Sequence, residues 1–298
     1  MNQESQPLVS VVIACYNHAA FVQSCIQSVI EQTYQNIELI IIDDGSQDIS
    51  VEKIQKMVLA CEKRFTRFEF RYRSNKGLTA TLNEALLWCQ GQYYCPFASD
   101  DMMIKKKISL QLKYMENHEN CAGVFGGYEI IDEDGVVINL RKKSSKRYVF
   151  NDIFLHNHEL PAPTQLLRMN IIKEIGGYAS DILIEDWYMW LKIAELGYTL
   201  DYINVEFVQY RRHNNNMSNR YDKMQDARLQ VLQFFSSNPN YVQALANSYL
   251  VASNDWLKTD KKKSMVYFRK SFQIDPKIFI DKKRIKKIIK YIIKYLVV

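Results

Sequence analysis

Two pairs of adjacent carboxylates, Asp43-Asp44 and Asp100-Asp101, each follow an apolar run of strand length. Hard divalent cations bind carboxylate oxygens and neutralise the charge that develops on a departing diphosphate. Carboxylates also accept hydrogen bonds from base N–H groups and from sugar hydroxyls. The two pairs therefore predict a nucleotide site with a divalent cation, although either pair taken alone also fits a solvated turn.

A third acidic segment, Ile184-Glu185-Asp186-Trp187, stands at the start of a helix predicted at residues 186–196. A carboxylate in such a segment can act as a general base that takes the proton of an attacking hydroxyl. Inverting glycosidases use a carboxylate in this way. Asp186 fits this role, and it fits equally well as the N-cap of the helix.

Basic side chains gather in the segment Tyr210-Arg211-Arg212-His213. An imidazole can bind a metal, and a guanidinium can bridge phosphate oxygens. His213 and Arg211 are therefore candidates for the metal and for the diphosphate. We expect structural roles for the other histidines, because no spacing among them suggests a zinc site; they are His18, His118, His156 and His158.

The elements that must position these residues alternate along the first hundred positions. Apolar runs predict strands at 8–14, 37–42, 68–72 and 92–97, and helical periodicity predicts helices near 21–30, 50–62 and 79–89. Repeated β-α units predict a mainly parallel sheet flanked by helices, which binds ligands at the carboxyl ends of its strands. No glycine-rich dinucleotide motif or Walker lysine is present, which disfavours those two classes of site.

The later sequence changes character. After a helix at 105–117, residues 121–168 are rich in strand signals, and the chain reads as helical from about residue 217. We therefore predict a domain at 1–216, with a donor half at about 1–101 and an acceptor half at about 102–216. A helical extension at 217–298 follows.

Composition fits an ordinary globular protein, with 47% hydrophobic and 24% charged residues among 298. The polar N-terminus does not read as a signal peptide, and no apolar run is long enough to span a bilayer, so we expect a cytoplasmic protein. Six cysteines lie within the first 121 residues without a CxxC pair. This pattern predicts buried free thiols.

Charge is distributed unevenly. Residues 261–298 carry 13 Lys and Arg against two Asp, or +11, so residues 1–260 carry 6 − 11 = −5. Residues 281–298 form a predicted amphipathic helix with lysines on one face and isoleucines on the other, typical of helices on anionic membranes. The same pattern fits a terminal helix packed on the body. The acidic body argues against nucleic acid as a partner.

Taken in order, the motifs of residues 8–220 resemble the family 2 glycosyltransferases, which have the GT-A fold. The matching segments are Val9 to Asn17, Ser28 to Tyr34, Ile41 to Ser46, Asn75-Lys76-Gly77 with Asn83, Asp100-Asp101, Gly176-Gly177-Tyr178 and Glu185-Asp186. The resemblance implies an inverting transfer from a nucleotide-sugar donor, with Mn²⁺ or Mg²⁺.

The resemblance also implies roles for individual residues. It assigns contacts with the nucleoside to Ala14, Tyr16 and Asp44, with Asp43 beside them, and it places Asn75 and Lys76 in the segment near the nucleotide. It assigns the ribose to Asp100 and the metal to Asp101, with His213 as a second metal ligand.

On the acceptor side, the resemblance makes Asp186 the base. Glu185 and Arg211 are candidates for contacts with the acceptor or the diphosphate.

The resemblance therefore implies an enzyme that uses a nucleoside-diphosphate sugar, with UDP as the expected nucleotide. A cytoplasmic enzyme with a membrane-seeking tail fits a lipid-linked or glycan acceptor, as in capsule or lipopolysaccharide assembly. One alternative is a non-catalytic assembly protein on the membrane surface that retains the fold. Another is a nucleotidyltransferase, although Cys15-Tyr16-Asn17-His18 stands where its glycine- and arginine-rich loop would be.

Overall fold

The computed structural model describes residues 6–180, 182–213 and 216–279 of the chain. These residues form two compact units. The first unit comprises residues 6–150, 159–180 and 189–213, and the second comprises 151–158, 182–188 and 216–279. The predicted boundary at residues 216 and 217 lies near the start of the long final segment of the second unit, and it stays a prediction.

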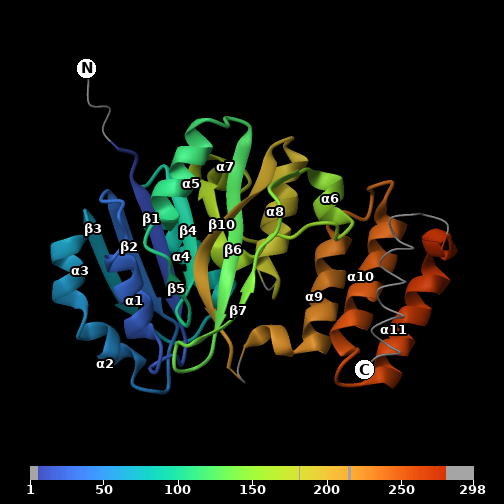
Figure 1. The fold of residues 1–298 in the computed structure, drawn as a ribbon, viewed down its shortest axis with the longest axis horizontal. Coiled ribbons are helices and arrows are strands. Elements are labelled where there is room, and N and C mark those ends of the chain that lie inside the picture. Colours follow the sequence, from blue (N-terminus) through green and yellow to red (C-terminus); the bar gives the residue numbers. More distant parts are fainter. Residues whose placement is uncertain (1–5, 181, 214–215, 280–298) are drawn as a thin grey trace. The chain divides into compact units, whose positions relative to one another are not determined.

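One sheet of ten strands runs through the described part of the first unit, in the order β3-β2-β1-β4-β9-β6-β10-β5, with β7 on β6 and β8 on β10 (Figure 1). Six strands share one direction, namely β1, β2, β3, β4, β6 and β10, and the other four run against them. The predicted mixed, mainly parallel sheet is confirmed. The strands are β1 (Val9–Cys15), β2 (Ile37–Asp43), β3 (Arg67–Tyr72), β4 (Tyr93–Ala98), β5 (Met102–Met103), β6 (Cys121–Ile131), β7 (Val137–Arg141), β8 (Lys146–Tyr148), β9 (Leu166–Arg168) and β10 (Thr199–Arg211).

The helices follow the predicted alternation with strands. They are α1 (Val22–Ile30), α2 (Ser50–Gln55), α3 (Val58–Arg64), α4 (Leu78–Trp88), α5 (Lys107–Glu116), α6 (Phe150–Phe154), α7 (Met169–Glu174), α8 (Glu185–Glu195), α9 (Tyr221–Gln233), α10 (Tyr241–Trp256) and α11 (Lys261–Ile274). Short 3₁₀ helices are η1 (Ala162–Thr164), η2 (Met217–Asn219) and η3 (Pro276–Phe279). The single helix predicted at 50–62 is wrong: Met57 N donates to Ile54 O, three residues back, and this tighter turn separates α2 from α3.

The first strands of the sheet are buried on both faces. Residues 9–13 of β1 and 37–42 of β2 have no exposed surface, as expected for continuous apolar runs in a parallel sheet. Strand β1 lies parallel to both β2 and β4, so the carboxyl ends of the three strands meet at one edge. The loops that carry the acidic pairs leave the sheet at this edge.

The second unit contains the helices after residue 216, so the predicted C-terminal helical extension is confirmed for residues 217–279. Small residues join α10 and α11: Ser253 Oγ donates to Ser264 O at 2.8 Å, and Ser271 Oγ donates to Ala246 O at 2.6 Å. Among the helices that the structure describes, none has the length and apolarity that a membrane span requires. The predicted helix at 281–298 lies outside the described residues.

All six cysteines are buried and unpaired with one another, which confirms the predicted free thiols. Two of them lie close to the acidic edge of the sheet. Cys25 Sγ contacts Ala98 O at 3.4 Å, and burial raises the pKa of Cys15 to about 12. The thiols near this edge are therefore uncharged packing groups.

Candidate nucleotide and metal site

Hydrogen bonds join the loops that follow β1 and β2. Asn17 has a left-handed backbone, with φ 55°, and its amide donates to Ser46 Oγ at 2.8 Å. Its side-chain Oδ1 accepts from Gln47 N at 2.7 Å. This pairing leaves Tyr16 46% exposed at the end of β1, beside the half-buried Ala14. Both predicted nucleoside contacts therefore stand at the carboxyl edge of the sheet.

Asp43 holds the turn that ends β2. The carboxylate is fully buried, and it accepts from Ser46 N at 2.8 Å and from Ser46 Oγ at 2.6 Å. An acidic side chain that accepts from an amide three residues on stabilises a turn of this kind. Asp43 thus fixes the shape of the loop on which the predicted nucleoside contacts lie.

Asp44 joins β2 to the loop at residues 73–77. Its Oδ1 accepts from Lys76 N at 2.8 Å and from the Arg73 guanidinium, and its Oδ2 accepts from Gly77 N at 2.9 Å. Asn75 Nδ2 donates to Asp44 O at 2.8 Å. The Asp44 carboxylate thus accepts hydrogen bonds from other residues of the chain. Through these bonds it positions two further residues of the predicted nucleotide site, Asn75 and Lys76. The Lys76 side chain itself is exposed.

Gly45 leads to a prediction about this loop. Gly45 has φ 77°, and a Cβ there would lie 2.6 Å from the backbone N of Asn75; Gly176 has φ 81°, but a Cβ there would meet no described atom within 4 Å. We expect Gly176→Ala to lower the free energy of unfolding by about 1–2 kcal/mol, the cost of left-handed backbone. Gly45→Ala should lower it further, because the obstructing atoms are backbone. Urea unfolding of both variants checks this, and equal losses would contradict it.

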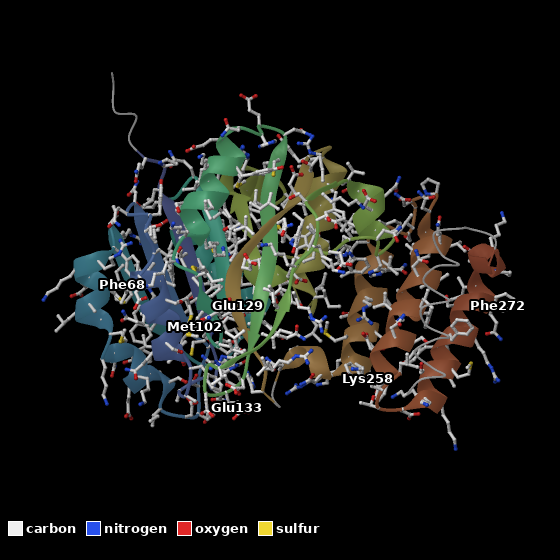
Figure 2. The ribbon with its side chains drawn as sticks, in the orientation of Figure 1. Phe68, Met102, Glu129, Glu133, Lys258 and Phe272 are labelled. Atoms are coloured by element: carbon white, nitrogen blue, oxygen red, sulfur yellow. The ribbon has the colours of Figure 1, made fainter. Side chains whose placement is uncertain are left out.

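The ends of β4 and β10 meet at Asp100 and Asp101. Asp101 is fully buried, its Oδ1 accepts from Arg211 N at 2.9 Å, and its Oδ2 has no hydrogen bond with any described residue. Arg211 Nε donates to Asp100 O at 2.9 Å, and its NH1 donates to the carbonyls of Asp132 and Glu133 at 3.0 and 2.8 Å. Glu133 is labelled in the β6–β7 turn in Figure 2. The Arg211 guanidinium therefore ties the β4 end to this turn.

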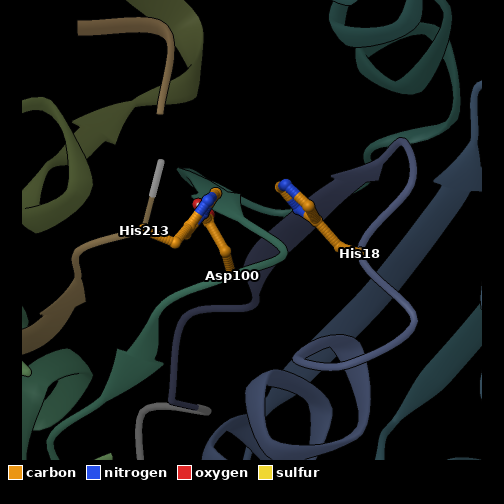
Figure 3. A group of neighbouring side chains, drawn as sticks. All are labelled: His18, Asp100 and His213. Carbon is orange, nitrogen blue, oxygen red and sulfur yellow. The ribbon is translucent and has the colours of Figure 1, made fainter. Parts of the chain in front are cut away.

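His213 lies against the other carboxylate of the pair. Its Nε2 is 2.9 Å from Asp100 Oδ2, and its ring stacks on Phe21 with centroids 5.2 Å apart. The ring of His18 faces the same carboxylate (Figure 3), and one ligand atom from each of His18, Asp100 and His213 lies within 4.8 Å of the others. We call these three residues the His-Asp-His cluster. Two imidazoles and a carboxylate form a donor set suited to a divalent metal ion.

Burial shifts the pKa values of two side chains at this edge of the sheet. Burial raises the pKa of the Asp101 carboxyl well above its ordinary value; the negative charge of Asp100 adds to the rise, and Arg211 opposes it. Burial lowers the pKa of His18, against the opposing charge of Asp100. A buried carboxylate with an oxygen that lacks a partner is costly, and a nearby cation compensates that cost. The orphaned Asp101 oxygen and the adjacent cluster therefore both fit a bound cation.

Asp186 belongs to the second unit, at the second position of α8. Its Oδ1 accepts from Trp187 N at 2.6 Å, and the Trp187 ring stacks on His156 with centroids 4.4 Å apart. Burial raises the pKa of Asp186 to about 6. The pKa of Glu185 is raised further, first by burial and then by the charge of Asp186. A carboxyl with its pKa near neutrality suits a general base.

The first unit thus brings together at one edge most of the predicted site residues. They are Ala14, Tyr16, Asp43, Asp44, Asn75, Lys76, Asp100, Asp101, Arg211 and His213. His18 was expected to be structural, and the structure adds it to the cluster. Its position in the sequence could have indicated this role, because His18 lies just after the carboxyl end of β1, as the acidic pairs lie at the ends of β2 and β4. The predicted convergence of Asp186 with this edge stays a prediction.

Two curated proteins are similar to this chain over most of its length. An uncharacterised glycosyltransferase of Methanocaldococcus jannaschii is 27% identical over 220 residues, covering 72% of this chain and 74% of the relative. The Escherichia coli enzyme WfgD is 27% identical over 234 residues, covering 78% and 88%. Its name describes a β-1,3-glucosyltransferase with UDP-glucose as donor and α-D-GlcNAc-diphosphoundecaprenol as acceptor.

Solved structures share the fold. Residues 1–349 of Staphylococcus aureus TarS, in complex with UDP-GlcNAc, align with a TM-score of 0.63 and 15% identity, covering 96% of this chain and 89% of that fragment. The Pyrobaculum calidifontis mannosyltransferase PcManGT, in complex with GDP-mannose and Mn²⁺, aligns with a TM-score of 0.58 and 12% identity, covering 98% and 88%. The predicted GT-A fold is confirmed. The sequence profile described as glycosyl transferase family 2 matches residues 10–176, more than half of the chain, and the protein belongs to this family.

Proposed function

We propose that this protein is an inverting, metal-dependent glycosyltransferase that moves a sugar from a UDP-sugar to a hydroxyl of a lipid-linked oligosaccharide or glycan. The observation that carries the proposal is the gathering of a metal-binding donor set and two ordered acidic loops at the carboxyl edge of one parallel sheet. In sheets of this kind, that edge is where ligands bind. Family membership supports the glycosyl transfer itself.

The donor side of the proposal uses the loops after β1 and β2. The exposed ring of Tyr16 offers a face for the nucleobase, with Ala14 two residues earlier on β1 and with Asn75 and Lys76 on the loop that Asp44 binds. Asp43 and Asp44 keep these loops in place through their bonds to backbone amides. A site held rigid before binding loses less conformational entropy when the nucleotide arrives.

The positions of the possible ligand atoms indicate which residues bind the metal ion. We propose that Asp100 and His213 hold the divalent cation, because these two side chains already lie 2.9 Å apart and face a third ligand candidate. Asp101, the sequence-predicted ligand, then supports the site through its bond with Arg211 N, and its second oxygen has no hydrogen-bond partner among the described residues. A cation bound there supplies Lewis-acid stabilisation of the departing diphosphate.

The acceptor side of the proposal depends on Asp186. The acceptor oxygen forms a bond to the anomeric carbon from the face opposite the leaving diphosphate, and the bond from this carbon to the diphosphate oxygen breaks with its electron pair on the diphosphate. Asp186 accepts the proton of the acceptor hydroxyl. Its raised pKa strengthens it as a base, and burial also raises the pKa of Glu185, which favours the protonated form that can donate a hydrogen bond to the acceptor.

The acceptor class rests on the relatives and on the charge of the chain. WfgD acts, by its name, on a diphosphoundecaprenol-linked sugar. The basic segment at 281–298 suits attachment to an anionic membrane surface, where such an acceptor resides. We therefore propose a peripheral enzyme at the inner face of the cytoplasmic membrane, working in capsule or lipopolysaccharide assembly.

Thermal unfolding with nucleoside diphosphates tests the donor half of this proposal. A ligand that binds only the folded state stabilises it, by about 2.7 kcal/mol at a hundredfold excess over its Kd. We expect UDP with Mn²⁺ to raise the Tm by several degrees, UDP alone to raise it less, and UDP-sugar hydrolysis to depend on Mn²⁺. A chain that responds to no nucleoside diphosphate, with or without Mn²⁺, and hydrolyses no donor would be the non-catalytic assembly protein instead.

A further inference from the structure

Hydrogen bonds of its backbone fix the position of His18 in the His-Asp-His cluster. Its amide donates to Ser50 Oγ at 3.0 Å, and its carbonyl accepts from Phe21 N and Val22 N, both at 2.9 Å. These bonds attach residue 18 to the starts of α1 and α2. The imidazole is therefore held at the edge of the sheet before any ligand binds.

Ser99 orients the ring. His18 Nδ1 lies 2.7 Å from Ser99 Oγ, on the residue directly before Asp100. When Nδ1–H donates to this hydroxyl, the lone pair of the ring belongs to Nε2, which is then the nitrogen that can bind a metal ion. Metal-binding histidines commonly use their second nitrogen in such a bond, which fixes tautomer and orientation. Ser99 is thus the kind of neighbour that a ligating His18 needs.

The second imidazole is near enough to share one ion. The rings of His18 and His213 meet edge to face with centroids 5.7 Å apart and an angle of 82° between their planes. The Asp100 carboxylate completes the cluster at 2.9 Å from His213. A single cation can therefore bind one atom of each side chain after small rotations.

We propose that His18 is a third protein ligand of the divalent cation, and that the cluster binds Mn²⁺ in preference to Mg²⁺ and before the nucleotide. This inference deepens the proposed function and rests on it for its catalytic meaning. Imidazole nitrogen suits transition metals, whereas Mg²⁺ prefers oxygen ligands and keeps its waters. Three protein ligands also hold a cation without help from the diphosphate. The sequence leaves open whether the ion is Mn²⁺ or Mg²⁺, and this ligand set favours Mn²⁺.

Electron paramagnetic resonance of free Mn²⁺, titrated with the nucleotide-free full chain, tests the inference. We expect saturable binding of about one ion, little displacement by equimolar Mg²⁺, and roughly tenfold or greater weakening in His18→Ala. His118→Ala is the matched control, because His118 lies at the end of α5 with its Nδ1 bonded to Tyr114 O. It should bind Mn²⁺ like the unmodified protein.

The outcomes separate this inference from the proposed function. Unchanged Mn²⁺ affinity in His18→Ala, with affinity lost in Asp100→Asn, would overturn the role of His18 and leave the glycosyltransferase proposal intact. Absence of Mn²⁺ binding without UDP, together with a Tm rise on adding both, would likewise overturn it. Should His18→Ala fail to fold, His18→Asn keeps a polar side chain of smaller reach and is expected to lose the same affinity.

Discussion

Replacing Asp186 by Asn should lower kcat by about 10²- to 10⁴-fold, the range that a positioned general base contributes. Asn has nearly the same shape but cannot accept the proton of the acceptor hydroxyl. The KM for the UDP-sugar should change little, because the donor contacts lie in the first unit. Steady-state transfer to a lipid-linked acceptor measures both constants.

Two comparisons make the result for Asp186 specific. Glu195→Gln changes an exposed carboxylate at the other end of α8, and it should leave kcat unchanged. In the unmodified enzyme kcat should fall as the pH drops through about 6, because the raised pKa protonates the base there. The Asn variant should lack this acid limb. An Asp186→Asn enzyme with normal kcat, or with the limb retained, would remove Asp186 from the mechanism.

Asp100→Asn should be comparably damaging, through the metal. We expect the transfer rate to fall about a thousandfold, since Lewis-acid stabilisation contributes several kcal/mol and each 1.36 kcal/mol is a factor of ten. Mn²⁺ affinity should fall with the rate, and excess Mn²⁺ should restore part of it. Rate measurements across a Mn²⁺ series separate loss of metal from loss of fold.

Asp101→Asn is the matched change on the adjacent residue. The Asn side-chain oxygen can still accept from Arg211 N, so Mn²⁺ affinity should fall less than in Asp100→Asn. The order of the two losses decides which carboxylate faces the metal. A greater loss for Asp101→Asn would return the metal to the residue that the sequence indicates.

Sequence patterns predicted the strands of the sheet because β1 and β2 are mostly apolar, with Ser10 and Glu38 as interruptions, and such runs have few alternatives in a chain of β-α units. They failed at the helix 50–62, where the periodicity of apolar residues continues across the turn at Lys56 and Met57. Periodicity reports which face is buried, and Ile54 and Cys61 are both buried on either side of that break. The break itself depends on a local backbone hydrogen bond that leaves no mark on the pattern.

The sequence predicted which loops form the site, but it predicted less well the role of each side chain on these loops. Asp100 and Asp101 are adjacent, and only the path of the backbone after β4 decides that Asp100 meets His213 while Asp101 turns to Arg211 N. Arg211 was a candidate for the diphosphate, yet its guanidinium bonds carbonyl groups of the chain. Roles of this kind depend on contacts between distant segments, which one sequence does not contain.

The bonds from Asp44 to the loop at 73–77 bear on how new specificities arise in such a protein. The donor contacts that we propose stand on short segments clamped to the ends of buried strands, outside the apolar interior. Substitutions at exposed positions such as Tyr16 or Lys76 can therefore alter which nucleotide is accepted at little cost to folding. Because the Asp44 bonds hold this loop against β2, evolution or protein engineering can change the residues that contact the nucleotide while the buried sheet stays the same.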